Sequence, residues 1–490
     1  MSDTGFADVL RRIQSHREVT QVATAAIVLL VAWSVGKSIA DHDLGLPIAV
    51  VGIGVFSLLF FRRTSLLWLT PVVMTLPNMG LDIPGPWAIS IEDAFVMLAF
   101  GALVTRNILS RRPVVPRDVP IVMPMLAFLG LAFGSLIKVA SVSPGTILLI
   151  VRIMRLTMLV MLYLALVDVM RRKEHVKTVV RVLLITAVPT AAISWYIYLT
   201  ESPFFYTILT MKPAYIFYKR NILRMISIMG STSFTGLYYA LIMALAWTYA
   251  PFRTNARLRP LRFAFLALML SCLILTLNRG TWVGVMFGLA LWIVVGGINR
   301  RKVVTLTLLA AGIVILVSTH FFTRFDAEQS LDVAIEVSRS SGTARIVRWI
   351  SAVNVLTSEP FFGVGYNNYA YVYGRFSVEE GIVRLYGSPH NMYVDILAGL
   401  GLVGFAVFAL FLRRLWRMHA DNLRRTRDPE LWGVSAGLYL ALAFFFGASA
   451  FDSFLFKPHH TSFIAFTLWA VASAIWRINR DEPVIRTGVG

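Results

Sequence analysis

Long apolar runs, each of roughly 20 residues, recur along the whole 490-residue chain. A helix of about that length crosses the hydrocarbon core of a bilayer. The runs contain Pro and Gly and do not alternate with period two, so they fit helices better than barrel strands. With 57% hydrophobic and 15% charged residues, the chain has more apolar surface than a water-soluble core can bury. We therefore expect an all-α polytopic membrane protein.

The apolar runs predict about 14 transmembrane helices, in a range of 12–14. We expect no cleavable signal peptide, because the first run lacks a small-residue cleavage site and is followed by further spans. The predicted spans lie near residues 20–36, 44–61, 65–79, 91–105, 119–137, 147–168, 178–199, 226–250, 263–277, 281–297, 303–318, 392–412, 431–450 and 462–476.

Short clusters of arginine between the apolar runs predict the orientation of the helices. Cytoplasmic loops of membrane proteins carry an excess of Lys and Arg. Clusters such as those at residues 11–17, 106–117 and 413–427 predict that both termini lie in the cytoplasm. The net charge of +20 is explained by these clusters, so we expect no nucleic-acid partner.

The connection at residues 319–391 is far longer than the others and divides the chain into three parts. Residues 1–318 would form about 11 transmembrane helices, and residues 392–490 the last helices and a cytoplasmic tail. The connection is too rich in aromatic residues and glycine to be disordered. We expect it to form a large ordered loop subdomain on the periplasmic face.

Lys and Arg are enriched in cytoplasmic loops, so each arginine on the external side calls for an explanation. The loop at residues 200–225 carries Arg220 and Arg224, either as a solvated basic loop or as part of a site. Arg279 lies at the tip of a two-helix hairpin, at the outer membrane boundary. It either snorkels to water or binds an anion. We favour an anionic ligand, because other basic residues converge on this face.

Two arginines lie inside a predicted span. Arg152 and Arg155 are three residues apart and share one helix face. Because intramembrane arginines are costly in lipid, they should face the bundle interior. They would pair with a buried acid such as Asp93 or Asp395, or contact a ligand, and the sequence does not decide between these roles.

The large loop brings further candidates to the external face. His390 ends the loop, where an imidazole can accept a proton from an attacking hydroxyl or donate to a leaving phosphate, although a structural role is the alternative. Arg345 and Arg348 share a helix face and could hold a pyrophosphate bidentately. Their alternative partners are the acids Asp332, Glu336 and Glu359.

No cluster of ligands has the spacing of a metal site, and Cys272 is the one cysteine of the chain. We therefore expect no metal and no cofactor.

Three segments lie in order between roughly residues 270 and 410. They are Leu277-Asn278-Arg279-Gly280, Arg348-Trp349 through Pro360-Phe361-Phe362-Gly363-Val364-Gly365-Tyr366-Asn367-Asn368-Tyr369, and Pro389-His390-Asn391-Met392-Tyr393 leading into Gly399-Leu400-Gly401-Leu402-Val403-Gly404. Together they resemble the O-antigen ligase and polymerase superfamily of bacterial membrane glycan transferases, which implies a protein of the bacterial inner membrane. A fourth segment, Arg224 to Gly230, is similar to the family's Arg and Gly before a span, but Ser233-Phe234-Thr235 replace the usual Pro-Asn.

The resemblance implies a metal-independent glycosyltransferase of lipopolysaccharide or exopolysaccharide biosynthesis, with its active site facing the periplasm. It would transfer a glycan from undecaprenyl pyrophosphate to a hydroxyl of an acceptor glycan or of lipid A core, among partners of the polysaccharide export machinery. We favour a polymerase over a ligase. Arg279 and His390 would be catalytic. The expected substrate-binding residues are Arg220, Arg224, Arg345, Arg348 and Asn391.

Two other classes of protein remain open. A polysaccharide or lipid-linked oligosaccharide transporter would also have many spans and cavity arginines, but the long loop and the lack of a detectable repeat count against it. A scaffold without chemistry would leave Arg279 and His390 without a shared purpose.

Overall fold

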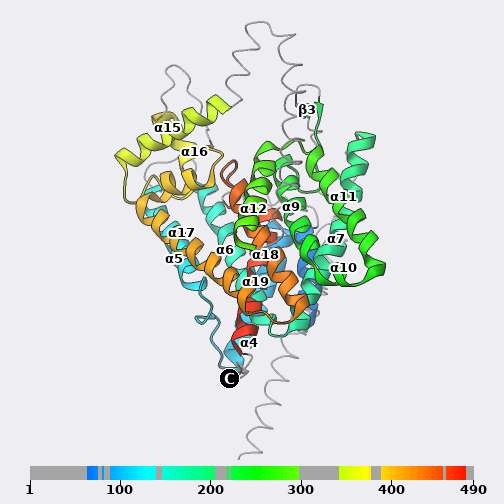
Figure 1. Cartoon of the computed structure of the whole chain (residues 1–490). Coiled ribbons are helices and arrows are strands. Elements are labelled where there is room, and N and C mark those ends of the chain that lie inside the picture. Colours follow the sequence, from blue (N-terminus) through cyan, green and yellow to red (C-terminus); the bar gives the residue numbers. More distant parts are fainter. Residues whose placement is uncertain are drawn as a thin grey trace, which may run out of the picture. The chain divides into compact units, whose positions relative to one another are not determined.

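The structure is a computed structural model, and the described residues are almost wholly helical (Figure 1). Predicted spans near 20–36, 44–61 and 303–318 lie outside the described residues, as do Arg220 and much of the large loop. The structure describes residues 63–75, 80–81, 89–139, 146–202, 204, 218–219, 222–296, 342–376, 388–455 and 460–481.

The helices follow the apolar pattern of the sequence. Two short hairpins interrupt them: β1 (Gly80–Leu81) pairs with β2 (Ile89–Ser90), and β3 (Tyr218–Lys219) pairs with β4 (Ile222–Leu223). The helices are α3 (Arg63–Thr75), α4 (Ile91–Leu109), α5 (Val122–Val139), α6 (Thr146–Val169), α7 (Lys173–Thr200), α9 (Thr232–Thr248), α10 (Ala250–Thr254), the 3-10 turn η1 (Ala256–Leu258), α11 (Arg259–Leu275), α12 (Arg279–Gly296), α15 (Gly342–Ser358), α16 (Tyr369–Phe376), α17 (Met392–Arg425), α18 (Pro429–Ala448) and α19 (His460–Asp481).

Seven helices in the described part of the chain are long and apolar enough to cross a membrane, so the expectation of about 14 is met only in part. Each of the seven matches a predicted span. At the other described positions the helices are shorter or more charged. The seven are Val122–Val139, Ile147–Val169, Lys173–Thr200, Ala256–Leu275, Met392–Arg425, Pro429–Ala448 and Thr461–Asp481.

The predicted span at 226–250 is longer than the helix found there. α9 has 17 residues, because Ser231 caps its first turn by accepting a hydrogen bond from the backbone N–H of Ser233. Gly230 precedes the cap with φ 71°. At 91–105 the helix α4 forms as predicted, but Glu92, Asp93 and Arg106 give it more charge than an apolar span tolerates.

Small residues bring α18 close to its neighbours. A Cβ atom on Gly284 of α12 would lie 2.5 Å from the backbone nitrogen of Ala448. On the other side, a Cβ on Gly437 of α18 would lie 2.6 Å from Thr248 Oγ1 of α9. Between membrane helices, where hydrophobic driving force is small, such close backbone approach supplies the packing energy. The result is a three-helix contact of α9, α12 and α18.

The segment that follows α15 fills a break in α17. Gly401 has φ 63° and interrupts the helical backbone. The segment after α15 donates to α17 from Val364 N to Ala398 O at 3.0 Å. In return, Leu402 N of α17 donates to Pro360 O at 2.8 Å. These bonds dock α15 and α16 beside α17 (Figure 1).

The close contact of α12 with α18 yields a test of packing. Gly284→Ala should lower stability by about 1–3 kcal/mol, because the added methyl meets backbone rather than a movable side chain. Gly130→Ala, in α5, is the matched control, since its Cβ would meet no atom within 4 Å. Thermal unfolding of the purified protein in detergent, followed by tryptophan fluorescence, measures both. Equal melting temperatures for the two variants would contradict the packing account.

Candidate functional site

The hairpin between α11 and α12 is held by Asn278. Its side-chain oxygen accepts a hydrogen bond from the N–H of Thr281 at 2.9 Å, and its side-chain nitrogen donates to Ser233 Oγ at 2.5 Å. Leu277 before it has φ 51°, so the chain turns sharply between the two helices. Arg279 is therefore the first residue of α12, with its side chain exposed.

Arg224 contacts the turn between α11 and α12. Its guanidinium donates to Thr276 O at 2.9 Å and to Leu277 O at 2.7 Å, carbonyls that end α11 and lack helical partners. Burial lowers the pKa of Arg224, and the charge of Arg279 lowers it further. The two like charges therefore act on each other, as expected for neighbouring guanidiniums.

His390 and Asn391 form the start of α17. The side-chain oxygen of Asn391 accepts from the N–H groups of Tyr393 at 3.0 Å and Val394 at 3.2 Å, so it caps the helix. His390 has φ 49°, and its Nδ1 lies 3.5 Å from Asp452 Oδ1. The carboxylate thus faces one ring nitrogen of the imidazole.

α15 contacts the chain just before His390. Arg348 donates to Ser388 O at 3.2 Å, and Trp349 Nε1 donates to Pro389 O at 2.9 Å. Burial lowers the pKa of Arg345; the charge of Asp452 opposes this shift, and the charge of Arg348 adds to it. Arg345 and His390 are thus both influenced by Asp452, while Arg348 contacts the backbone two residues before His390.

The turn after α18 joins these groups to the α12 hairpin. A Cβ on Gly280, the residue after Arg279, would lie 2.6 Å from Phe451 Cβ. Phe451 is followed by Asp452, the partner of His390. Arg279 and His390, 111 positions apart in the sequence, are thus placed on two sides of the same turn.

The part of the chain that contains Arg279 and His390 matches a known protein family. Residues 263–409 match the family model described as O-antigen ligase. The chain carries a domain of the O-antigen ligase family. An uncharacterized protein of Haemophilus influenzae is 27% identical over 164 residues, which are 31% of this chain and 41% of the relative. The chain thus spans less than half of that relative, whose name assigns no activity.

The O-antigen ligase domain contains Arg279, Arg345, Arg348 and His390, but not Asp452. The sequence analysis missed Asp452. Its signal was an acidic residue in the short segment between two apolar runs on the predicted external side. Glu359, an alternative partner considered for the α15 arginines, pairs instead with Lys138 Nζ of α5 at 2.5 Å.

Arg152 contacts the O-antigen ligase domain from α6. Its guanidinium donates to Asn367 Oδ1 at 2.6 Å and lies 5.4 Å from the ring centre of Tyr371. The amide of Asn367 and the ring of Tyr371 are thus two of its contacts. Asp395, one of the acids considered for it, accepts a hydrogen bond from Ser453. Arg155 is half-buried one turn further along α6. In the described residues no group of three or more His, Cys, Asp or Glu could hold a metal ion.

The two roles considered for Asn391, helix cap and substrate contact, can be separated. Asn391→Ala should destabilise the protein by about 0.5–2 kcal/mol, because the first turn of α17 loses its acceptor, whereas Asn391→Ser keeps an acceptor and most of the stability. Thermal unfolding in detergent measures both variants. If glycan transfer falls in Asn391→Ser while its melting temperature stays at the wild-type value, substrate contact is the better reading.

Proposed function

We propose that the protein transfers a glycan from an undecaprenyl-pyrophosphate donor to a hydroxyl of an acceptor, on the periplasmic face of a bacterial inner membrane. The observation that carries this proposal is the convergence of Arg224, Arg279 and the pair of His390 with Asp452 around the 449–453 turn. The match to the O-antigen ligase family supports the reaction class.

In this proposal the pyrophosphate of the donor binds at Arg279 and Arg224. Arginine stays charged and binds phosphate oxygens through a planar fork of donors. As the bond between the anomeric carbon and the pyrophosphate oxygen breaks, negative charge grows on the leaving group, and the two guanidiniums stabilise it. Arginine here takes the place of a divalent cation, so the mechanism is metal-independent.

His390 activates the acceptor. Asp452 faces Nδ1, which leaves Nε2 free to accept the proton of the attacking hydroxyl. The hydroxyl oxygen forms the new bond to the anomeric carbon, and undecaprenyl pyrophosphate departs. Asp452 orients the imidazole and stabilises its protonated form, which makes it a positioning residue.

Polymerase and ligase differ in the acceptor that this site would use. A polymerase joins the glycan to another lipid-linked repeat unit, and a ligase joins it to lipid A core. We favour the polymerase, because the chain has many spans and a large loop to hold two lipid-linked chains. Formation of polymer from the lipid-linked donor alone supports this choice, whereas product that requires added lipid A core supports the ligase.

The chemical roles are tested with purified full-length protein and a lipid-linked donor in the presence of EDTA. His390→Ala should lower turnover by roughly 10²- to 10⁴-fold with little loss of donor binding, because it removes the general base. Arg279→Lys should also lose turnover, since a point charge cannot replace the bidentate fork.

Asp452→Asn should lower turnover and keep donor affinity, because the imidazole loses its orienting charge. Glu174→Gln, at an exposed position in the first turn of α7, makes the same change of charge as a control and should keep wild-type activity. Wild-type turnover of a well-folded His390→Ala or Arg279→Lys protein would remove that residue from the mechanism. Loss of all activity in EDTA, restored by magnesium, would refute the arginine-only mechanism.

The proposed orientation places Ser358 outside the cell and Ser110 inside it. Both side chains are exposed, and the native Cys272 is buried. In a Cys272→Ala background, an impermeant thiol reagent added to spheroplasts should label Ser358→Cys and not Ser110→Cys. Labelling of Ser110→Cys alone would reverse the topology and exclude a periplasmic site.

A further inference from the structure

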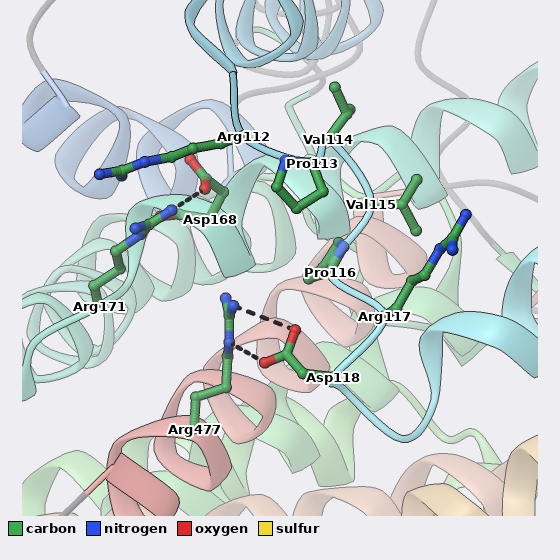
Figure 2. Close-up of a pocket in the computed structure, with 10 residues that line it drawn as sticks. All are labelled: Arg112, Pro113, Val114, Val115, Pro116, Arg117, Asp118, Asp168, Arg171 and Arg477. Atoms are coloured by element: carbon green, nitrogen blue, oxygen red, sulfur yellow. Dashed lines mark hydrogen bonds and ion pairs between the residues drawn. The ribbon is translucent and has the colours of Figure 1, made fainter. Parts of the chain in front are cut away.

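A cavity of about 810 Å³ lies where α4, α6 and α19 end and α5 begins (Figure 2). Its lining includes Pro113–Pro116, a stretch with two prolines and two half-buried valines. Its charged lining residues are Arg112, Arg117, Asp118, Asp168, Arg171 and Arg477.

The cavity is far from the candidate site. On α6, Arg152 contacts the O-antigen ligase domain and Asp168 lines the cavity. The 16 residues between them correspond to about 24 Å along a helix axis. Because α5, α6 and α19 are apolar spans, the cavity lies at the level where these helices leave the hydrocarbon core.

Both aspartates of the cavity are already neutralised. Arg477 meets Asp118 with two contacts, Nε to Oδ2 at 2.8 Å and Nη2 to Oδ1 at 3.3 Å, and Figure 2 shows this paired fork. Asp168 is paired with Arg171 at 2.5 Å and also with Arg106. One pair joins the 110–121 connection to α19 and the other joins α6 to α4, so these ion pairs form walls of the cavity.

Two arginines of the cavity lining form no ion pair with its aspartates. Arg112 and Arg117 lie on either side of the 113–116 stretch with exposed side chains, and neither forms an ion pair with another residue in the ranges that the structure describes. Four arginines thus line the cavity against two aspartates, and Arg106 adds a further positive charge beside Asp168. The surplus charge is positive, in a cavity that borders the membrane.

We propose that this cavity binds a phosphate-bearing anion, and that in the membrane its occupant is the headgroup of an anionic phospholipid. Guanidinium groups bind phosphate oxygens strongly, and the paired walls leave Arg112 and Arg117 to supply the attraction. The valines and prolines of the 113–116 stretch give the glycerol and first acyl carbons an apolar surface. Basic pockets between membrane helices are suited to such headgroups.

The test compares two double variants of the full-length protein. Arg112→Gln with Arg117→Gln removes the two arginine charges that are not paired with these aspartates, without breaking an ion pair of the walls. Arg424→Gln with Arg425→Gln, exposed at the end of α17, makes the same change of charge elsewhere. Native mass spectrometry of delipidated protein then measures binding of phosphatidylglycerol, phosphatidylcholine and inorganic phosphate.

Phosphatidylglycerol should bind the wild type and the Arg424/Arg425 variant alike, and the Arg112/Arg117 variant roughly 30-fold more weakly, since each basic residue near a membrane surface contributes about a fivefold preference. Selective loss of inorganic phosphate binding instead would support the phosphate site and identify free phosphate as its source. Equal binding of both anions by all three proteins would overturn the site. Equal affinity of the wild type for phosphatidylcholine and phosphatidylglycerol would overturn the role of charge.

Discussion

Backbone hydrogen bonds between the segment after α15 and the broken turn of α17 hold the candidate site together. A break in a membrane helix leaves N–H and C=O groups without partners, and in a poorly hydrated environment each unpaired group is costly. Here residues 360–365 supply those partners on both sides of Gly401. Gly363, with φ 61°, lies against the backbone of Ala398 and Gly399, so a Cβ at this position would collide with α17. Gly363 and Gly401 are thus required for the segment after α15 to pack on α17.

The end of α18 contacts both the start of α17 and the α12 hairpin. The end of α18 accepts a hydrogen bond from Met392 N at Ser449 O, 2.9 Å away, and so fixes the start of α17. The same end approaches Gly284 and Gly280 of α12. One helix end therefore sets the positions of both His390 and Arg279, although neither residue belongs to α18.

Much of the helical fold could be predicted from the sequence, because apolar periodicity acts locally. The predicted site residues Arg279, Arg345, Arg348 and His390 lie within the matched domain, and their roles stay predictions. Seven predicted spans and the helix carrying Arg345 and Arg348 correspond to described helices. What the sequence could not predict depends on contacts between distant segments. The cap at Ser231 shortened α9. Arg152 donates a hydrogen bond to Asn367, 215 positions away, a contact that the sequence did not predict.

The sequence also did not predict the backbone conformation of several turns. Leu277, Asn367 and His390 all have positive φ, which non-glycine residues adopt rarely and at a cost that the surrounding structure must offset. Each of the three lies in a segment that resembles the O-antigen ligase family. In the described ranges two further non-glycine residues have positive φ, Arg111 after α4 and Glu201 at the end of α7. All five therefore lie in turns or at helix ends, and three of them lie in the turns that carry Arg279, the partner of Arg152 and the imidazole.

The helix termini explain why the paired arginines suit an anionic ligand. Arg224 donates to carbonyls at the C-terminal end of α11, where the helix dipole favours positive charge. Arg279 begins α12, where the dipole disfavours it, and the nearby Arg224 adds repulsion. An anion at this point would reverse both penalties, because helix N-termini and guanidiniums attract the same charge. The free-energy gain would be largest for a group whose negative charge grows as a bond breaks. A departing pyrophosphate is such a group, so in the proposed mechanism the hairpin would stabilise the transition state more than the bound donor.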